Sequence, residues 1–310
     1  MPPRRRGVDT LSEVLPVRLT VVVCTLDRAE LLDGCLRAVL ADRPSDGSVE
    51  VVVVDNGSTD ATPAVVASHD GVRYVFEPRR GLARARNAGL AAAAAGMVAF
   101  LDDDARPAPG WSGALLHASE RWSSAVAIGG PVVLEWGAVR PRWLVPALTR
   151  WFSAVDHGPT QRLLEPHEHP GGANLAVARD PAMAVGGFSP ELGRVGPSLA
   201  SEEEVDLLRR LRATGGEVAW EPAAAVRHLV PPERMTRRWI LRRAWAQGRS
   251  DTTAARLAGT PSRRDGRLAL HALVRGWPTA VRTIRAAEVS SGAITQEIVR
   301  RARRLARALH

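Results

Sequence analysis

Four apolar runs rich in β-branched residues alternate with helical patterns between residues 18 and 104. Continuous runs of this kind are typical of strands buried on both faces, so they predict buried strands over 18–25 and 49–55; a shorter strand over 72–78 and a fourth over 97–104 are also predicted. The intervening segments carry apolar residues at helical spacing, most clearly over 28–41 and 82–95. Alternating strands and helices require right-handed crossovers and parallel pairing. We therefore expect a Rossmann-like α/β/α sandwich around a mostly parallel central sheet.

The regular alternation ends after residue 105, and the second half mixes several kinds of pattern. The sequence predicts helices over 111–125 and 201–216, and strands over 127–136, 171–179 and 217–222. Residues 1–16 are expected to form a disordered arm, residues 17–232 one catalytic domain and residues 233–310 a basic helical extension. We detect no internal repeat.

Charge divides the chain unevenly. All 42 basic residues are arginine, and the net charge is +9. From Arg234 onward there are 18 arginines and only 4 acids, whereas residues 1–233 are net acidic.

The N-terminal residues show no apolar stretch of the kind found in a signal peptide, and no apolar run is long enough to span a bilayer. Two cysteines that fit no disulfide or metal spacing favour a reducing cytosol.

Three consecutive carboxylates, Asp102, Asp103 and Asp104, follow the apolar strand 97–101. Like charges roughly 5 Å apart repel by about 3 kcal/mol at an effective dielectric near 20. A shared proton or a bound cation relieves that repulsion, and open α/β sheets place ligands at the carboxyl ends of their strands. Mg²⁺ and Mn²⁺ take carboxylate oxygens together with substrate phosphates, so the cluster is a candidate metal site. A solvated acidic turn is the alternative.

Other chemically suggestive residues each admit a structural interpretation as well. Asp55 ends a strand before a tight turn, where it either binds a ligand or caps the next helix. Glu203 and Glu204 open a helix, where the macrodipole already favours acids, although adjacent carboxylates also raise a pKa as a general base requires. His228 follows a late strand, as a metal ligand or as a structural histidine.

The order of these motifs resembles that of the family-2 glycosyltransferases with the GT-A fold. The resemblance covers roughly residues 18–230 and is carried by CTLDR, VVVVDNGSTD, GLARARNAG, FLDDDARP, GGANLAVAR and an acidic run before VDLLRRL, with WEP and a histidine after it. It implies a nucleotide-sugar half over 17–105 and an acceptor half over 106–232. It also implies an inverting transfer that depends on Mn²⁺ or Mg²⁺.

The resemblance assigns expected roles to individual residues. It places Thr25, Asp27, Arg28 and Asp55 against the nucleotide base and ribose, and Arg84 or Arg86 near the donor. It matches Asp102, Asp103 and Asp104 to the DXD motif, with Asp104 on the metal and His228 near the metal and diphosphate. It places Gly172, Ala173 and Asn174 in a loop beside the sugar and acceptor.

The sequence departs from the family's pattern at the position of the catalytic general base. The family's usual Glu-Asp pair appears here as Glu203-Glu204, so the expected base is Glu204, one methylene longer than aspartate, with Glu203 in reserve. The base would deprotonate an acceptor hydroxyl or amine, which attacks the anomeric carbon opposite the diphosphate. A UDP-sugar is the favoured donor, with GDP- and dTDP-sugars as alternatives.

Two rival classes make different demands on the sequence. A nucleotidyltransferase would carry a glycine-rich phosphate loop after the first strand, where this chain has CTLDRAELL. Nucleic-acid binding through the basic tail is the other rival, but the body is acidic, so no nucleic-acid partner is expected.

Arginines beside tryptophans in the tail also suit an anionic membrane surface. The expected location is the cytoplasm, with peripheral contact to the inner face of the membrane as one option.

Overall fold

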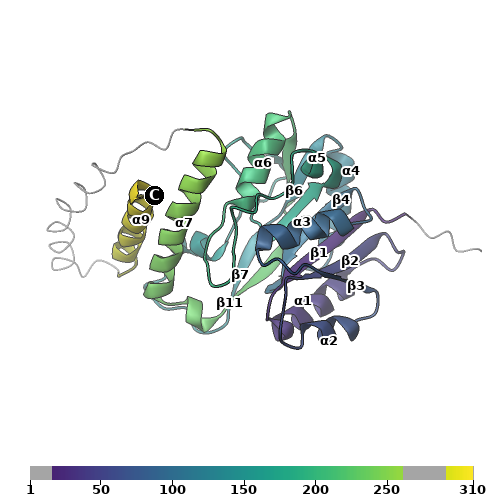
Figure 1. The fold of residues 1–310 in the computed structure, drawn as a ribbon, viewed down its shortest axis with the longest axis horizontal. Helices are drawn as coiled ribbons and strands as arrows, with labels where there is room; N and C mark the ends of the chain where they lie inside the picture. Colours follow the sequence, from purple (N-terminus) through teal and green to yellow (C-terminus); the bar gives the residue numbers. More distant parts are fainter. Residues whose placement is uncertain (1–15, 261–290, 310) are drawn as a thin grey trace, which may run out of the picture.

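The computed structural model describes residues 16–260 and 291–309, with an eight-stranded central sheet in the order β3-β2-β1-β4-β9-β6-β10-β8 (Figure 1). The predicted first half is present as four parallel strands: β1 (Leu19–Thr25), β2 (Val49–Asp55), β3 (Val72–Phe76) and β4 (Met97–Asp102). Nearly all of the predicted N-terminal arm and residues 261–290 of the tail lie outside the described residues.

The second half of the sheet mixes directions. Strand β9 (Asn174–Ala178) runs antiparallel to both of its neighbours, β4 and β6 (Ala125–Gly129). Strand β10 (Glu217–Trp220) pairs parallel with β6 and antiparallel with β8 (Arg162–Leu163). Four of the seven pairings are parallel, which confirms the expected mostly parallel sheet.

The prediction of a single strand over 127–136 is wrong. The chain leaves the main sheet after Gly129 and resumes as β7 (Val132–Trp136) in a three-stranded sheet with β11 (Val226–Val230) and β5 (Ala105–Pro107). The break falls at Gly130, where an added Cβ would lie 1.9 Å from the Ala224 carbonyl oxygen. Because apolar residues flank this break on both sides, hydrophobicity alone does not reveal it.

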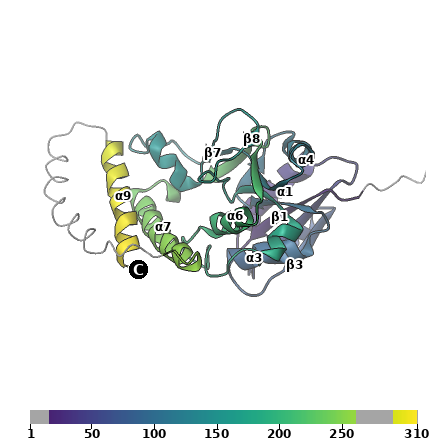
Figure 2. The same ribbon diagram turned by 90° about the horizontal axis from the view of Figure 1, so that it is seen from above.

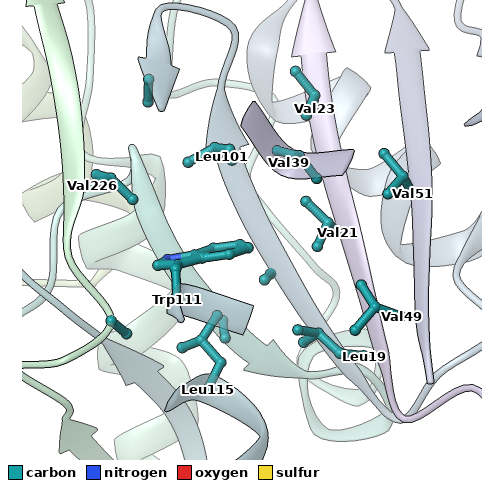
Figure 3. Close-up of a cluster of buried hydrophobic side chains, with 14 of the residues drawn as sticks. Leu19, Val21, Val23, Val39, Val49, Val51, Leu101, Trp111, Leu115 and Val226 are labelled. Atoms are coloured by element: carbon teal, nitrogen blue, oxygen red, sulfur yellow. The ribbon is translucent and has the colours of Figure 1, made fainter. Parts of the chain in front are cut away.

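Side-chain alternation along the strands divides the core between the two faces of the sheet. Val21 and Val23 point into one cluster, and Val22 points into the other. The first cluster, part of which is drawn in Figure 3, packs under α1 (Ala29–Asp42), α2 (Thr62–Ala67) and α4 (Trp111–Arg121). The second packs under α3 (Leu82–Ala92), α5 (Arg179–Ala184) and α6 (Glu203–Ala213). Helices on both faces complete the α/β/α sandwich.

Helix α7 (Arg237–Leu257) and helix α9 (Ser291–Leu309) pack side by side against the catalytic body (Figure 2). A third apolar cluster joins them to the short helix η1 (Pro146–Phe152), with Val299 of α9 fully buried in it, and the short helix η2 (Pro232–Arg234) contacts α7. Within the described residues, none of the helices combines the length and apolar character needed to cross a membrane.

Candidate functional site

The candidate site lies at the carboxyl ends of β1 and β4, which are neighbours in the sheet. Their register sets Cys24 opposite Asp102, so the residues just after each strand meet. Thr25 Oγ1 donates a hydrogen bond of 2.8 Å to Asp103 Oδ2. A cavity of about 250 Å³ opens here, and Thr25, Arg28, Asp102 and Asp103 line it. The carboxyl edge of the sheet thus holds the ligand-sized space, as open α/β sheets generally do.

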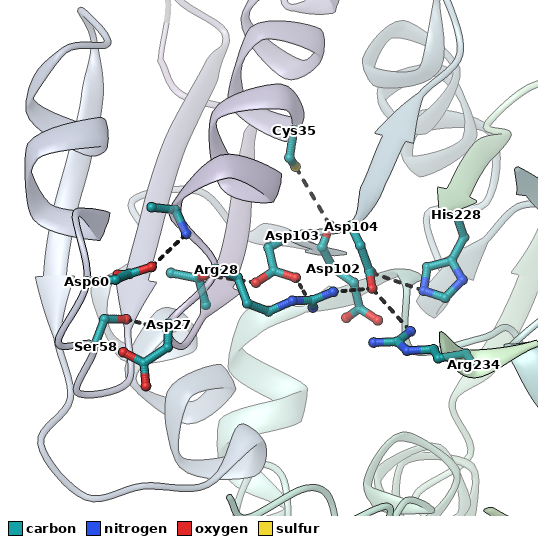
Figure 4. Close-up of polar contacts among 12 residues, drawn as sticks. Asp27, Arg28, Cys35, Ser58, Asp60, Asp102, Asp103, Asp104, His228 and Arg234 are labelled. Carbon is teal, nitrogen blue, oxygen red and sulfur yellow. Dashed lines mark hydrogen bonds and ion pairs between the residues drawn. The ribbon is translucent and has the colours of Figure 1, made fainter. Parts of the chain in front are cut away.

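One arginine binds two of the three aspartates. Arg28 forms a salt bridge to Asp103 and donates a 2.6 Å hydrogen bond from Nη2 to Asp104 Oδ2 (Figure 4). Asp103 and Asp104 are both buried, whereas Asp102 keeps 30% of its side chain exposed. The repulsion expected among three adjacent carboxylates is therefore relieved by neighbouring cations, and the exposed Asp102 faces the cavity.

The small sheet brings His228 to the aspartates. Strand β11 pairs with β5 so that His228 lies opposite Ala105, the residue after Asp104. His228 Nε2 lies 3.0 Å from Asp104 Oδ1, and Arg234 Nη1 lies 3.3 Å from Asp104 Oδ2 (Figure 4). The Asp104 Oδ1 contact is not aligned as a hydrogen bond, so that buried oxygen and His228 Nδ1 both lack hydrogen-bond partners.

Asp102, Asp104 and His228 have the donor chemistry of a divalent metal site. Each offers one ligand atom, and these atoms all lie within 4.8 Å of one another. Two carboxylate oxygens and an imidazole nitrogen suit Mn²⁺ or Mg²⁺, with the remaining positions left for phosphate or water. Asp104 Oδ1 accepts no hydrogen bond and has His228 Nε2 as its ionic neighbour, so these two buried atoms could share a metal between them.

The two buried aspartates have pKa values shifted in opposite directions. Burial raises the pKa of Asp103 to about 7, although Arg28 opposes the shift. Burial also acts to raise the pKa of Asp104, but His228, Arg28 and Arg234 outweigh it and hold that pKa well below its usual range. Asp104 is therefore the carboxylate most firmly kept ionised, as a metal ligand requires.

A second carboxylate pair faces the same cavity from the start of α6. Glu203 and Glu204 both line it, and Arg86 of α3 binds Glu203 Oε1 at 2.8 Å. Buried Arg86 also contacts Asp102 Oδ1 at 3.3 Å and donates a 2.9 Å hydrogen bond to the Gly172 carbonyl oxygen. It therefore joins the aspartate cluster, the glutamate pair and the Gly172 loop.

Glu204 differs from Glu203 in its partners. Each of the two residues has a buried Oε2 without a hydrogen bond, but no salt bridge holds Glu204 within the described parts of the chain. Gly172 lies against it, since an added Cβ there would be 3.3 Å from Glu204 Cδ. Burial raises the pKa of Glu204, and burial together with Glu204 raises the pKa of Glu203 to about 7.

The structure separates several sequence-predicted residues from this cavity. Among the described residues, the cavity lining includes Thr25, Arg28, Arg86 and the Gly172–Ala173 pair. It does not include Asp27, Asp55, Arg84 or Asn174, nor Asp104 and His228, which share the metal donor set with Asp102.

Two of these residues have partners that explain their positions. Asp55 is fully buried and accepts hydrogen bonds from Tyr74 Oη at 2.7 Å and from the Ser58 amide at 2.8 Å. Asn174 accepts a 2.9 Å hydrogen bond from Trp111 Nε1 and donates one of 2.7 Å to the Ala224 carbonyl oxygen. The contacts of Asn174 tie the loop to the core.

Sequence reasoning missed three cavity arginines, namely Arg194, Arg234 and Arg243. Burial and the nearby Arg194 lower the pKa of Arg243 to about 10, and burial together with Arg194 and Arg28 lowers the pKa of Arg234. Such clustered cations favour an anion in the cavity. The sequence gives a weak signal for Arg194, which lies between Gly193 and Gly196, and none that distinguishes the other two from the remaining arginines of the tail.

Comparison with known proteins agrees with this geometry. The family model described as "Glycosyl transferase family 2" matches residues 20–181. A glucosyl-dolichyl phosphate glucuronosyltransferase of Haloferax volcanii is 29% identical over 76% of this chain and 76% of its own length. The succinoglycan biosynthesis protein ExoM of Rhizobium meliloti is 29% identical over 76% of this chain and 74% of its own.

Among solved structures, a mannosyltransferase from Pyrobaculum calidifontis in complex with GDP-Man and Mn²⁺ has a TM-score of 0.61 at 22% identity, covering 96% of this chain and 89% of that one. GalNAc-T7 with UDP, GalNAc and Mn²⁺ has a TM-score of 0.54 at 16% identity, covering 74% and 47%. Both support the GT-A fold. Because the family model spans more than half of the sequence, the chain belongs to glycosyl transferase family 2.

Proposed function

We propose that this glycosyltransferase moves a sugar from a nucleoside-diphosphate sugar to a hydroxyl or amine acceptor with inversion at the anomeric carbon. The observation that carries the proposal is the meeting of two carboxylate groups at one cavity. Asp102 belongs both to the cavity wall and to the Asp102–Asp104–His228 donor set. Glu204 lies in the same wall.

The aspartate side of the cavity is proposed to hold the donor diphosphate. Asp102, Asp104 and His228 would hold Mn²⁺ or Mg²⁺, which supplies Lewis-acid stabilisation of the charge developing on the leaving group. Arg28, Arg194 and Arg234 line or border the same space and add positive charge toward the phosphates. Fixed cations in a partly closed site favour a diphosphate more strongly than they would in water.

Glu204 is the proposed general base, with Glu203 in reserve. Arg86 forms a salt bridge to Glu203, whereas Glu204 has no salt bridge within the described residues and lies beside the Gly172 loop. Its raised pKa brings it closer to the working pH, which favours proton abstraction from an acceptor hydroxyl. The acceptor would lie between Glu204 and the sugar, with Gly172 and Ala173 against it.

A UDP-sugar is the proposed donor, with GDP- and dTDP-sugars as alternatives. Solved relatives of the same fold hold UDP in one case and GDP-Man in another, so the fold accepts both bases. Thr25 lines the cavity, and Asp27 and Asp55 lie near the strand ends beyond it. We propose these residues for the nucleoside, and Asp55 would then exchange its Tyr74 hydrogen bond for one from the base or ribose.

Exposed arginines on α7 and α9 are proposed to contact an anionic membrane surface. Arg238, Arg242 and Arg304 are all exposed, and basic residues near such a surface contribute about 1 kcal/mol each. Co-sedimentation with phosphatidylglycerol vesicles, but not with phosphatidylcholine vesicles, is the expected result. Equal sedimentation with both would contradict the proposal.

The test of the proposed function is calorimetric titration of UDP-glucose, GDP-mannose and dTDP-glucose with and without Mn²⁺. We expect Mn²⁺ to raise the affinity for at least one of them by about tenfold or more, which corresponds to roughly 1.4 kcal/mol. Asp104→Asn should abolish that gain while the protein stays folded, since a ligand is lost.

The matched control is Asp180→Asn, which removes an aspartate whose side chain is 91% exposed in α5. This variant should keep the gain in affinity. If Mn²⁺ strengthens binding of none of the three nucleotide sugars, the proposed metal-dependent transfer is wrong.

A further inference from the structure

A second hollow, of about 690 Å³, lies along α7 outside the catalytic cavity. We call it the α7 groove. One side is the segment 191–200, the floor is α7, and Ala302 of α9 closes one end. Its lining is largely apolar, including Leu192, Leu199, Leu241 and Trp245. The volume is in the range of pockets that hold ligands.

The charged side chains of the α7 groove are mostly positive. Arg242 and Arg249 lie three residues before and four residues after Trp245, so all three share one helix face. Within residues 16–260 and 291–309, neither arginine has a carboxylate partner. The acid in the groove lining is Glu191, which already pairs with Arg256. The groove therefore combines an apolar floor with two uncompensated guanidinium groups.

The α7 groove and the catalytic cavity share a wall. Ala200 lines both, with Gly196 and Ser201 on the catalytic side and Pro197 and Leu199 on the groove side. The same segment leads directly into Glu203, the first residue of α6. The reacting end of a molecule that lies in the groove would have to pass this wall to reach the proposed base.

The same helix also contributes to the catalytic cavity. Arg243, the residue after Arg242, lines that cavity and donates a 3.4 Å hydrogen bond to the Leu199 carbonyl oxygen. Adjacent residues of α7 thus serve the two hollows. Because one helix lines both hollows, a single extended ligand could contact both of them.

We propose that the α7 groove holds the phosphate and the apolar chain of a lipid-phosphate acceptor, whose reacting end crosses the Ala200 wall to Glu204. This inference rests on the proposed function. Guanidinium groups bind phosphate through paired, charge-assisted hydrogen bonds. Arg242 and Arg249 stand about 10.5 Å apart along the helix, so their long side chains can close on a phosphate from both sides of Trp245. The apolar lining of the groove would then bind the lipid's apolar chain. A free anion such as inorganic phosphate would leave this lining uncovered.

The experiment is calorimetric titration of the full chain with octyl phosphate below its micelle concentration, at constant ionic strength. We expect octyl phosphate to bind, and Arg242→Gln/Arg249→Gln to weaken it by about tenfold or more through loss of two charged hydrogen bonds. Trp245→Ala should also weaken it. Inorganic phosphate and octyl glucoside should each bind more weakly than octyl phosphate. The first contacts only the two arginines, and the second fills only the apolar lining.

The matched control removes the same charge elsewhere. Arg121→Gln/Arg140→Gln changes two exposed arginines outside the groove lining, and we expect less than about a twofold effect, as is usual for screened surface charge. An equal loss in the control would mean diffuse attraction and overturn the site. Tight binding of inorganic phosphate alone, or octyl glucoside binding as well as octyl phosphate, would also overturn it.

Failure of this inference is distinguishable from failure of the proposed function. Mn²⁺-dependent nucleotide-sugar affinity, measured in the same groove variants, should match that of the unmodified protein because the donor residues are intact. If the unmodified protein shows that affinity and does not bind octyl phosphate, the proposed function stands and the groove inference falls.

Discussion

Glu203 and Glu204 are neighbours with the same chemistry, yet the structure gives them different surroundings. Arg86 binds Glu203 at 2.8 Å, and no comparable cation holds Glu204 within the described residues. Arg86 opposes protonation of Glu203, since taking a proton weakens that ion pair, although burial and Glu204 still raise the pKa of Glu203 to about 7. At the residue scale, we therefore propose Glu203 as a positioning residue, held by Arg86, and Glu204 as the base.

We predict that Glu204→Gln lowers kcat by about 10²–10⁴-fold, the usual contribution of a positioned base. Mn²⁺-dependent donor affinity should be nearly unchanged, because Glu204 faces the acceptor side. The measurements are steady-state transfer kinetics and donor titration on the same preparation. Glu203→Gln is the comparison, and it should alter donor affinity as well through Arg86, which also contacts Asp102. Near-normal kcat for Glu204→Gln would rule out this base.

The pH dependence follows from the direction of the Glu204 shift. Burial raises its pKa above the ordinary value of 4.5, and only the ionised form accepts a proton. We predict that kcat falls as the pH drops through this raised pKa, so the acidic limb of the profile lies above pH 4.5. The measurement is kcat against pH at saturating donor. The limb should vanish in Glu204→Gln, and its persistence at the same pH would assign it to another group.

The site residues differ in how far the sequence identifies them. Asp102, Asp103 and Asp104 are visible because charges that directly follow a buried strand are unusual. Arg194 and Arg243 are not, because one lies in an irregular loop and the other in a helix where arginine is common. These two arginines reach the cavity only through tertiary packing, and no local sequence pattern predicts that packing.

The start of α6 is the element on which the proposed base depends. Glu202, just before the helix, has a φ of +81°, a left-handed conformation that costs a non-glycine residue energy. Gln247 of α7 donates a hydrogen bond to the Glu202 carboxylate and accepts one of 2.8 Å from Ser201 Oγ. The Ser201 amide also donates to Ser250 Oγ of α7 at 3.1 Å. Helix α7 therefore holds the turn that aims Glu204.

We predict that Gln247→Leu lowers kcat by roughly threefold to tenfold and leaves donor affinity within about twofold. The partly buried Glu202 carboxylate would lose its donor, a loss of about 1–3 kcal/mol that the strained turn can relieve by shifting. Transfer kinetics and donor titration separate the two effects. Gln296→Leu on α9 is a matched control, since that glutamine is only partly buried and lies outside this contact. An equal drop in the control would contradict a role in positioning.

Elements were predictable where burial is uniform along them. Strands β1 and β2 are continuous β-branched runs, and the structure confirms them and the fourth strand within a few residues, while β3, an edge strand with exposed side chains, is indicated by its place in the alternation. The run 127–136 has the same composition, yet Gly130 and Pro131 divide it between two sheets. That division fixes β11 beside β5 and hence His228 beside Asp104. Asp104 and His228 can each be picked out from the sequence, but the pairing of β11 with β5 that brings them together cannot.

At the scale of the whole molecule, the cavity is assembled from segments far apart in the chain. Cys24–Arg28 and Asp102–Asp103 come from the central sheet, Arg194–Glu204 from the loop before α6, and Arg234–Arg243 from the C-terminal helical part. The C-terminal part is therefore a wall of the site as well as a basic appendage. Binding a donor across the cavity should couple all of these segments.

We predict that UDP-glucose with Mn²⁺ slows amide hydrogen exchange in residues 194–204 and 234–247 together with residues 24–28. A ligand that binds only the closed form lowers the population of local openings in every segment it bridges. Exchange followed by mass spectrometry measures this, with α4 as the control because it packs on the far core cluster. Mn²⁺ alone should leave 194–204 unchanged, since its proposed ligands lie elsewhere. Protection confined to 24–28 would mean that the loop before α6 and the C-terminal helices do not close on the donor, and that the acceptor side of the cavity forms independently of it.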